Sequence, residues 1–397
     1  MMKKINKLKI ILKFSLLIII FNVIRLLSKR NPNIEDKTIL LIRLDAIGDY
    51  ILFRNFIKIL KESKKYKDYK ITLLGNIKWK ELAEFLDSKY VERFIWLDPV
   101  KFSKNIFYCY SKLKEITSRG YEIVINPVWS RTYEMDYIVK IVRAKQKIGY
   151  KGDITNIIKL IKKFSDKYYD LLIDGEKGII FEFYRNKYFF EKLLDCEIKI
   201  EKPYIDINFE RSDLKNFEIS DNSNYCILFI GASSNFKKWP IENFAQIANY
   251  LKSKYKYEIV LCGGKEDIES TKNFEKIYKG RYTNLVGKTS LVDIMFILSR
   301  AKLLITNETF IHHLAVALNV KNIIVIFNGN HFGRFVPYPE EIAKSLNHFT
   351  IFPPEINENI TNFQELINLY GYGSKLNISK ITVDEVKKVI DKILFND

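Results

Sequence analysis

Sequence features that mark several common protein classes are missing from this chain. Its four cysteines, Cys109, Cys196, Cys226 and Cys262, lie far apart and show no C-x-x-C or cysteine–histidine spacing, so they predict neither a disulfide framework nor a metal site. We expect them to be buried free thiols in a reduced compartment. Glycine and proline are also scarce, at 16 and 9 of 397 residues, while 47% of residues are hydrophobic. This composition excludes disordered and fibrous proteins.

Three ligand-binding motifs are absent as well. No G-x-G-x-x-G segment occurs, which removes the usual nicotinamide or flavin site. Gly287, Lys288 and Thr289 resemble the end of a phosphate-binding P-loop, but position 282 is Tyr where that loop needs Gly. No Asp is followed two residues later by another Asp, so the D-x-D arrangement that holds a divalent metal on a diphosphate is missing. We therefore expect no metal and no cofactor, and any bound phosphate would be neutralised by protein groups.

Acidic residues are few relative to basic ones. Lys and Arg number 65 against 47 Asp and Glu, which gives a net charge of +18, and the first 30 residues hold eight basic and no acidic side chains. The excess favours anionic partners such as nucleotide phosphates or acidic glycolipids. The charge is scattered and no nucleic-acid motif is present, so we predict no nucleic-acid partner.

The N-terminal segment predicts contact with a membrane. Residues 10–27 are strongly apolar and lie between basic residues. The uncharged run 14–24 would measure roughly 16 Å as a helix, against about 30 Å for a hydrocarbon core. Ser15, Asn22 and Lys29 recur every seven residues as a polar stripe, which favours a helix lying in the interface of an anionic leaflet. A single span over 10–27 is the alternative, and no small-residue cleavage site follows that would indicate a signal peptide.

Beyond this segment, short apolar runs alternate with helix-length amphipathic stretches, which is typical of α/β proteins with parallel sheets. We predict two Rossmann-like domains facing a cleft. The expected organisation is a membrane-associated helix at 1–30, an N-terminal domain at 31–208, a linker at 209–224 and a C-terminal domain at 225–397. The expected strands are 38–44, 70–76, 91–97 and 121–127 in the first domain, and 225–231, 257–262, 302–306 and 322–327 in the second. Residues 151–205 read as less regular, and 329–378 as rich in loops before a terminal helix.

A Gly-Asp pair follows the first predicted strand. Gly48 and Asp49 lie just beyond its carboxyl end, where open α/β sheets bind their ligands. A carboxylate there, stabilised by the dipole of the following helix, can accept a proton from a hydroxyl group. Helix capping is the structural alternative for Asp49. Asp45 is a weaker candidate, since it lies earlier in the turn and can serve to stabilise the loop.

Two segments of the second domain carry groups suited to a diphosphate. The loop after its first strand supplies the hydroxyls of Ser233 and Ser234 and the ammonium of Lys237, although a solvated basic loop would look the same.

Farther on, "LLITNETFIHHLAVAL" places Asn307 as a helix N-cap and Glu308 and Thr309 in the first turn, where a second anion could bind. His312 and His313 follow on this helix, and spacing alone does not rank one above the other.

Together these segments resemble glycosyltransferase family 9, the family of lipopolysaccharide heptosyltransferases. The resemblance covers residues 38–327 and rests on "ILLIRLDAIGD", "GASSNFKKWPIENFAQIA", "VLCGGKED", "NLVGKTSLVDIMFILSRAKLLITNET" and "HLAVALNV", taken in order. It implies the B-type glycosyltransferase fold and an inverting, metal-free transfer of heptose from ADP-heptose. By motif position it implies that Asp49 is the catalytic base, that Lys237, Ser233 and Ser234 contact phosphate, and that His313 is the family's histidine.

Other assignments follow from position at strand ends. Glu266 or Asp267 would bind ribose hydroxyls, Glu308 the donor sugar, and the helix start at Thr309 the departing diphosphate. The sequence also departs from the family. The usual D-T-G is Glu308-Thr309-Phe310 here, and the usual "FGPT" is replaced by "FNGNHFGRFVPYP" with Asn330, His331 and Arg334, which leaves another nucleotide sugar open as the donor.

The expected function is therefore a sugar transferase with a lipopolysaccharide-type or other anionic glycolipid or oligosaccharide acceptor. We expect it at the cytoplasmic face of the bacterial inner membrane, held peripherally or by a single N-terminal anchor through residues 1–30. A catalytically inactive membrane-bound protein with the same two domains is the alternative from another class. Such a protein would bind no nucleotide despite the presence of Asp49 and Lys237.

Overall fold

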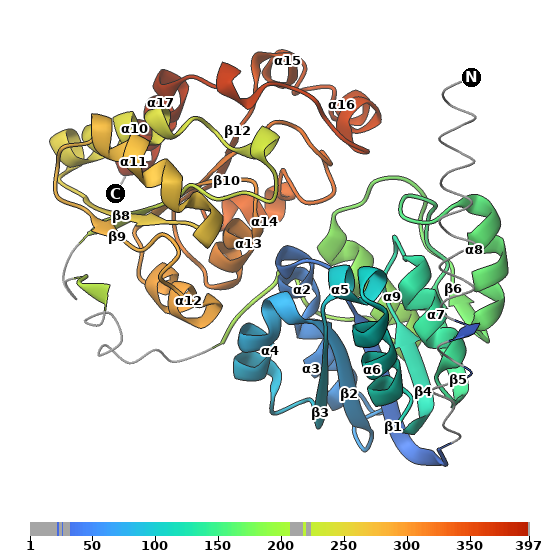
Figure 1. The fold of residues 1–397 in the computed structure, drawn as a ribbon. Helices are drawn as coiled ribbons and strands as arrows, with labels where there is room; N and C mark the ends of the chain where they lie inside the picture. Colours follow the sequence, from blue (N-terminus) through green and yellow to red (C-terminus); the bar gives the residue numbers. More distant parts are fainter. Residues whose placement is uncertain (1–21, 24–25, 27–31, 207–216, 220–223, 396–397) are drawn as a thin grey trace, which may run out of the picture. The chain divides into compact units, whose positions relative to one another are not determined.

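A computed structural model of the chain describes residues 22–23, 26, 32–206, 217–219 and 224–395. Its contacts divide the chain into two compact units (Figure 1). Unit 1 comprises Met1–Ala46, Phe56–Glu176 and Asn186–Ile198, and unit 2 comprises Ile47–Asn55, Lys177–Arg185 and Lys199–Asp397. Most of the predicted segment 1–30 and of the predicted linker 209–224 lies outside the described residues. Within the described ranges, no helix is long and apolar enough to cross a membrane.

Unit 1 is built on a six-stranded, fully parallel sheet with the order β3-β2-β1-β4-β5-β6 (Figure 1). The strands are β1 (Ile34–Arg43), β2 (Lys70–Asn76), β3 (Arg93–Leu97), β4 (Gly120–Asn126), β5 (Ala144–Tyr150) and β6 (Leu171–Ile173). The last six residues of β1 are all buried, as expected for a central strand covered on both faces. The four strands predicted for this part are confirmed, whereas β5 and β6 were not predicted.

The helices of unit 1 follow the strands. They are α3 (Asn55–Glu62), α4 (Lys80–Asp87), α5 (Pro99–Lys104), α6 (Ile106–Ile116), α7 (Tyr133–Ile141), α8 (Lys159–Ser165) and part of α9 (Glu182–Leu194), with short 3-10 turns η1 (Ile77–Trp79) and η2 (Asp166–Tyr168). Side chains of α5, α6 and α7 pack with β1 and β4 in one buried cluster that includes Phe102, Leu113 and Tyr137. Asn105 and Thr132 cap α6 and α7 by accepting backbone N–H groups.

Unit 2 repeats the architecture with a second six-stranded parallel sheet, ordered β12-β11-β10-β7-β8-β9. Its strands are β7 (Tyr225–Phe229), β8 (Glu258–Cys262), β9 (Thr283–Asn284), β10 (Leu303–Asn307), β11 (Ile323–Ile326) and β12 (His348–Ile351). Its helices include α2 (Ile47–Phe53), α10 (Ile241–Tyr255), α11 (Ile268–Ile277), α12 (Leu291–Ser299), α13 (Phe310–Ala317), α14 (Glu340–Lys344), α15 (Pro354–Asn357), α16 (Phe363–Tyr370) and α17 (Val383–Leu394).

Local sequence signals account for several of these helices. Thr382 and Glu385 form a reciprocal capping box that starts α17, and Ser290 and Asp293 do the same for α12. Helix α10 ends at Tyr255, and its C-cap residue Lys256 adopts the left-handed conformation. The four strands predicted for the C-terminal domain and its terminal helix are confirmed. The fold class is thus two parallel-sheet α/β units.

The two stretches predicted to be less regular or rich in loops also contain regular elements, and the prediction that Cys196 is buried was wrong. The stretch 151–205 contains α8, β6 and α9, and the stretch 329–378 contains β12 and three helices. The reason is that the strands there are short: β12 has four residues and β6 has three, too few for a readable alternation. Cys196 is exposed rather than buried, whereas burial is complete for Cys226 and Cys262 and raises the pKa of both thiols.

Candidate active site

A buried asparagine organises the loop after β7 in unit 2. The Asn307 side chain donates from Nδ2 to the carbonyl oxygens of Ile230 (2.9 Å) and Gly231 (3.3 Å), and its Oδ1 accepts from the backbone N–H of Trp239 (2.9 Å). The loop 230–239 is therefore tied at both ends to the carboxyl end of β10. The prediction of Asn307 as a helix N-cap is wrong, because its amide is used across the sheet and Thr309 occupies the N-cap of α13.

This loop carries Lys237 to a carboxylate at the end of β10. Lys237 ends the 3-10 turn η4 (Asn235–Lys237), and its Nζ lies 2.5 Å from Oε2 of Glu308. Both side chains are only 11% exposed. Burial raises the pKa of the Glu308 carboxyl, and the neighbouring Lys237 ammonium opposes that change. The result is a single, nearly buried ion pair at the carboxyl edge of the sheet, where parallel α/β sheets bind ligands.

Helix α13 begins beside this pair. Thr309 is its N-cap with extended backbone and no side-chain cap hydrogen bond, so Glu308 and Thr309 precede the first turn instead of lying in it as predicted. The first N–H groups of a helix lack intrahelical partners and favour anions. Phe310, the first helical residue, packs edge-on against Phe229 with ring centroids 5.7 Å apart. A bulky ring thus stands at the start of the helix.

The remaining predicted donor-binding residues are placed at the ends of β7 and β8. Ser233 is exposed, and Ser234 precedes η4, where its carbonyl accepts the N–H of Lys237. Asp267 is 1% exposed and accepts hydrogen bonds from the Gly264 N–H (2.9 Å) and from Lys238 Nζ (2.5 Å). Glu266 lies exposed on the same turn. Of the two alternatives for a ribose contact, Glu266 is the accessible one.

Asp49 lies in the first turn of α2, a helix that belongs to unit 2. Helix α2 packs against α13, and Gly48 is the point of closest approach. A Cβ atom at Gly48 would lie 3.0 Å from Cδ2 of His313 and 3.7 Å from the Cα of Phe310. The absence of a side chain at Gly48 therefore lets α2 sit against the start of α13, so that Asp49 and the Lys237–Glu308 pair are carried by one unit.

His313 is part of a buried histidine cluster. Its Nδ1 lies 2.7 Å from the hydroxyl oxygen of Tyr338, and it also packs beside His312, while His348 lies near both His312 and Tyr338. Burial lowers the pKa of His313 to about 3 and that of His348 to about 4, and it lowers the pKa of His312 in the same way. The three imidazoles are neutral at pH 7. A direct phosphate contact by His313 stays a prediction, and the structure shows this ring against Gly48.

Arg334 and Asn330, in the loop after β11, contact residues of other segments of unit 2. Arg334 Nε lies 3.2 Å from Oε2 of Glu182, and Asn330 Oδ1 accepts the Ser374 N–H (3.2 Å). His331 adopts a positive φ of 62°, and its pKa is lowered by burial and by the positive charges of Arg334 and Lys237.

Asp45, the weaker alternative to Asp49, lies in unit 1. Its carboxylate forms an ion pair with Arg43 (2.9 Å), and its carbonyl accepts from Asn76 and Trp79. These contacts give Asp45 a role in the loop after β1. Among the described residues, no group of three or more His, Cys, Asp or Glu side chains could hold a metal ion.

Comparison with known proteins decides the family. The sequence model of glycosyltransferase family 9 (heptosyltransferase) matches residues 111–357, well over half of the chain. The chain belongs to glycosyltransferase family 9. It is accordingly a glycosyltransferase of the heptosyltransferase type. No curated protein sequence matches the chain.

Solved structures confirm the fold. A glycosyl transferase family 9 protein from Veillonella parvula DSM 2008 aligns with a TM-score of 0.69 at 20% identity, over 92% of this chain and 99% of that one. E. coli ADP-heptose lps heptosyltransferase II aligns at 0.65 and 16% identity, over 90% and 99%. E. coli heptosyltransferase WaaC with ADP aligns at 0.62 and 16%, over 89% and 97%. The two α/β units thus resemble those of B-type heptosyltransferases.

The sequence did not predict the buried residues that contact His313 and its neighbours. Tyr338 and His348 lie in the stretch that reads as loops, and no spacing connects them to His313. The sequence indicates Gly48 only as part of a Gly-Asp pair, whereas in the structure its missing side chain lets α13 pack closely against α2. These contacts join residues far apart in the chain, so a single sequence offers no signal for them.

Proposed function

We propose that this protein is an inverting, metal-independent glycosyltransferase that transfers heptose from ADP-heptose to a lipopolysaccharide-type or other anionic cell-surface glycan. The observation that carries the proposal is the Lys237–Glu308 pair at the start of α13, at the carboxyl ends of β7 and β10. A nearly buried ammonium, beside helical N–H groups and the hydroxyls of Ser233 and Ser234, suits a diphosphate. The missing D-x-D motif supports neutralisation of that diphosphate by protein groups.

The reaction would be one displacement at the anomeric carbon. Asp49 accepts the proton of the acceptor hydroxyl as the new glycosidic bond forms and the bond to the diphosphate breaks. Lys237 and the N–H groups at Thr309 and Phe310 hold the charge that grows on the departing diphosphate. Glu308 turns from Lys237 to the donor sugar, and Glu266 binds the ribose. In this scheme every donor-contacting group and the base belong to unit 2.

A different nucleotide sugar is the second candidate, and one observation favours it. Phe310 stands where the family usually has glycine, and its ring packs against Phe229, so a bulky side chain lies at the start of α13. A donor with a smaller sugar than heptose would fit there more easily.

Binding and transfer measured separately test both candidates. Thermal stabilisation of the purified protein by ADP, GDP, UDP and CMP identifies the nucleotide, since a ligand at 100 times its dissociation constant adds about 2.7 kcal/mol of stability. Stabilisation by ADP together with transfer from ADP-heptose is expected. Stabilisation by another nucleotide would select the second candidate, and no stabilisation by any of them would identify an inactive protein and overturn the proposal.

The location of this enzyme is part of the same proposal. Nucleotide sugars are made in the cytoplasm, so we place the catalytic units at the cytoplasmic face of the bacterial inner membrane, held there through residues 1–30. Deleting residues 1–30 should leave a folded catalyst with weaker membrane binding, because β1 begins at Ile34. Sedimentation with membranes and transfer activity report on the two properties separately, and loss of folding would contradict this placement.

A further inference from the structure

Helix α8 of unit 1 exposes its apolar side chains. Leu160 and Phe164, one turn apart on this helix, are 63% and 56% exposed, and Ile154, in the segment that leads into it, is 58% exposed. Single exposed apolar residues are ordinary, but a group of large ones within 11 residues needs an explanation. We call Ile154, Leu160 and Phe164, together with the lysines described next, the α8 face.

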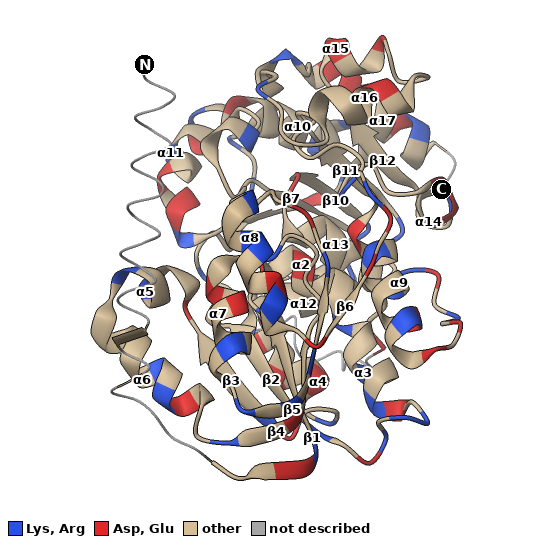
Figure 2. Cartoon of the chain, turned by 90° about the vertical axis from the view of Figure 1, so that its right-hand side faces the viewer, with Lys and Arg blue, Asp and Glu red and all other residues tan. Residues whose placement is uncertain are grey.

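Three lysines complete the α8 face. Lys159, Lys163 and Lys167 are exposed and follow one another at intervals of four residues. Figure 2 shows basic residues on α8. None of them forms an ion pair with another residue in the described ranges, and Lys167 Nζ lies 5.9 Å from the centre of the Phe164 ring.

Residues 154–168 contain one acidic side chain, and it does not neutralise the lysines of the α8 face. This residue, Asp166, is bound instead by Lys162 and Arg131. The α8 face therefore combines apolar groups with positive charge that the protein itself leaves unpaired.

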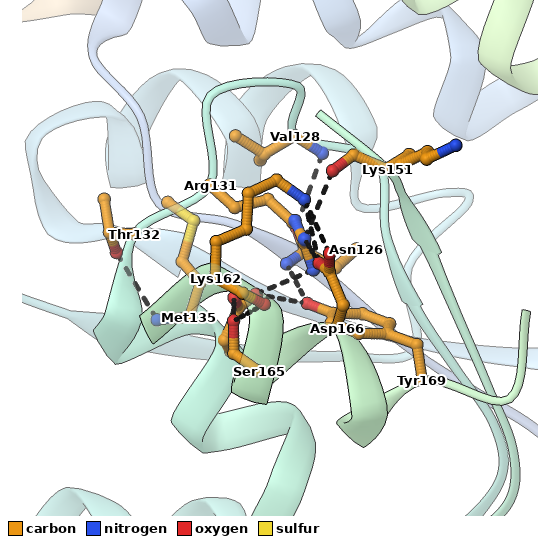
Figure 3. Close-up of polar contacts among 11 residues, drawn as sticks. Asn126, Val128, Arg131, Thr132, Met135, Lys151, Lys162, Ser165, Asp166 and Tyr169 are labelled. Carbon is orange, nitrogen blue, oxygen red and sulfur yellow. Dashed lines mark hydrogen bonds and ion pairs between the residues drawn. The ribbon is translucent and has the colours of Figure 1, made fainter. Parts of the chain in front are cut away.

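The opposite side of α8 packs against unit 1 through Ile161, which contacts the hydrophobic core, and through a buried polar network. Ser165 donates to Oδ2 of Asp136 (2.5 Å), and Lys162 Nζ lies 2.8 Å from Oδ1 of Asp166. Arg131 binds both Asp136 (3.2 Å) and Asp166. Figure 3 shows Arg131, Lys162, Ser165 and Asp166 converging, with Tyr169 among them. The network fixes α8 in the orientation that turns Leu160 and Phe164 outward.

The contacts on the buried side of α8 do not require Leu160 and Phe164 to be apolar. Burying charged groups costs free energy that their mutual attraction roughly offsets, so apolar packing of Leu160 and Phe164 inward would serve the fold as well. A face with apolar side chains at its centre and cations around them matches the boundary between phosphate headgroups and acyl chains of an anionic bilayer. The row of lysines is suited to the layer of phosphate headgroups on an anionic bilayer.

We propose that the α8 face is a membrane-docking surface that binds anionic lipid headgroups through Lys159, Lys163 and Lys167 and inserts Leu160 and Phe164 at the acyl boundary. It is separate in the chain from the apolar, basic segment at residues 1–30. Two weak membrane contacts on one chain reinforce each other, because the second contact becomes intramolecular once the first has formed. Unit 1 would then be held close to the bilayer surface.

Binding of the full chain to lipid vesicles tests whether the three lysines of the α8 face contribute to membrane docking. Lys159→Gln, Lys163→Gln and Lys167→Gln together should lower the partition coefficient on phosphatidylglycerol vesicles about 100-fold at low salt, at roughly fivefold per lysine. The matched control replaces three exposed lysines of α11 and its C-terminal flank in unit 2, Lys272, Lys276 and Lys279, by Gln. The control loses the same charge and should change partitioning less than threefold. Equal losses in both triple variants would overturn the proposal.

A fluorescent label tests the insertion itself. The variant is Phe164→Cys in a Cys196→Ser background, which removes the exposed native thiol, and it carries a polarity-sensitive dye. Its emission should shift to the blue on phosphatidylglycerol vesicles and not on phosphatidylcholine vesicles. The control label at Tyr372→Cys, 67% exposed in the parent, should not shift.

Two outcomes of the labelling contradict lipid docking. An unchanged spectrum on anionic vesicles shows that Phe164 does not reach the acyl boundary. A blue-shifted spectrum without vesicles shows that another part of the chain or a second copy covers the α8 face. Thermal unfolding of each labelled variant, compared with the parent, confirms that the protein remains folded.

Discussion

Two groups of buried charge in this protein differ in how fully their members are satisfied. In unit 1, Asp136 accepts hydrogen bonds from Ser165, Tyr169 and Arg131, and Arg131 also binds Asp166. In unit 2, among the described residues, Lys237 has one side-chain partner, Glu308. Asp136 and Arg131 thus each have more than one partner, although Arg131 Nε makes no hydrogen bond, whereas the single Lys237–Glu308 pair can exchange one partner for a phosphate. Burial of charge therefore identifies a binding site only where the pairing is incomplete.

The largest expected effect is on turnover, and it comes from replacing the proposed catalytic base of unit 2 without changing the stability of that unit. Asp49→Asn should lower kcat about 10²- to 10⁴-fold, because the amide keeps the shape but cannot accept the acceptor's proton. Nucleotide affinity and the melting temperature should stay close to those of the parent. Steady-state kinetics with a titration of the nucleoside diphosphate measures both properties. Turnover within threefold of the parent would remove Asp49 from the base role.

The opposite behaviour, a loss of stability without a loss of binding, is expected for the Arg131–Asp136 network of unit 1. Arg131→Met should lower the free energy of unfolding of unit 1 by about 3 to 5 kcal/mol, because Asp136 is left buried without its cation. Nucleotide affinity should not change. Urea unfolding followed by segment-resolved hydrogen exchange measures the loss, and Lys163→Met on the exposed side of α8 serves as its control. A loss under 1 kcal/mol would show that the network is dispensable for folding.

Removing the Lys237 ammonium should weaken binding of the nucleoside diphosphate. Lys237→Ala should weaken binding of the nucleoside diphosphate by about 10- to 150-fold, the equivalent of roughly 1.5 to 3 kcal/mol for a charge-assisted contact. The neighbouring Lys238, which is bound to Asp267, provides the matched control as Lys238→Ala. Isothermal titration of the three proteins makes the comparison. A larger effect at Lys238 than at Lys237 would move the phosphate site.

Acid should distinguish the two units. All four histidines of the chain lie in unit 2, and burial lowers the pKa of His313 to about 3 and of His348 to about 4, against about 6.5 unfolded. Because the unfolded chain takes up these protons first, the stability of unit 2 is complete above pH 6.5 and falls as the pH drops toward 4. At pH 5 each of these two histidines lowers the free energy of unfolding by about 2 kcal/mol relative to its value above pH 6.5.

Segment-resolved hydrogen exchange at pH 7 and pH 5, corrected for the intrinsic rates, checks this expectation. Protection should fall in α13 and β12 and stay nearly constant in β1 and β4. Equal losses in both units would contradict the assignment of the acid sensitivity to these histidines.

The sequence was informative where a residue acts next to its neighbours in the chain. The buried strands β1, β7, β8 and β10 are continuous apolar runs, and the groups at their carboxyl ends could be placed before the structure was known. The orientation of α8 could not, because Ser165 and Lys162 become buried only through Asp136 and Arg131, which lie more than 20 residues away. Likewise, the pairing of Lys237 with Glu308 joins residues 71 apart.

Binding of ADP to Glu308→Gln tests the central claim, that Lys237 leaves Glu308 to hold the donor diphosphate. The amide frees Lys237 and removes a carboxylate from the anion site, so the dissociation constant for ADP should fall several-fold by isothermal titration. Transfer from the nucleotide sugar should nevertheless slow, since ADP lacks the sugar that Glu308 is proposed to bind. An ADP affinity that is unchanged or weaker in Glu308→Gln would contradict the partner exchange on which the account rests.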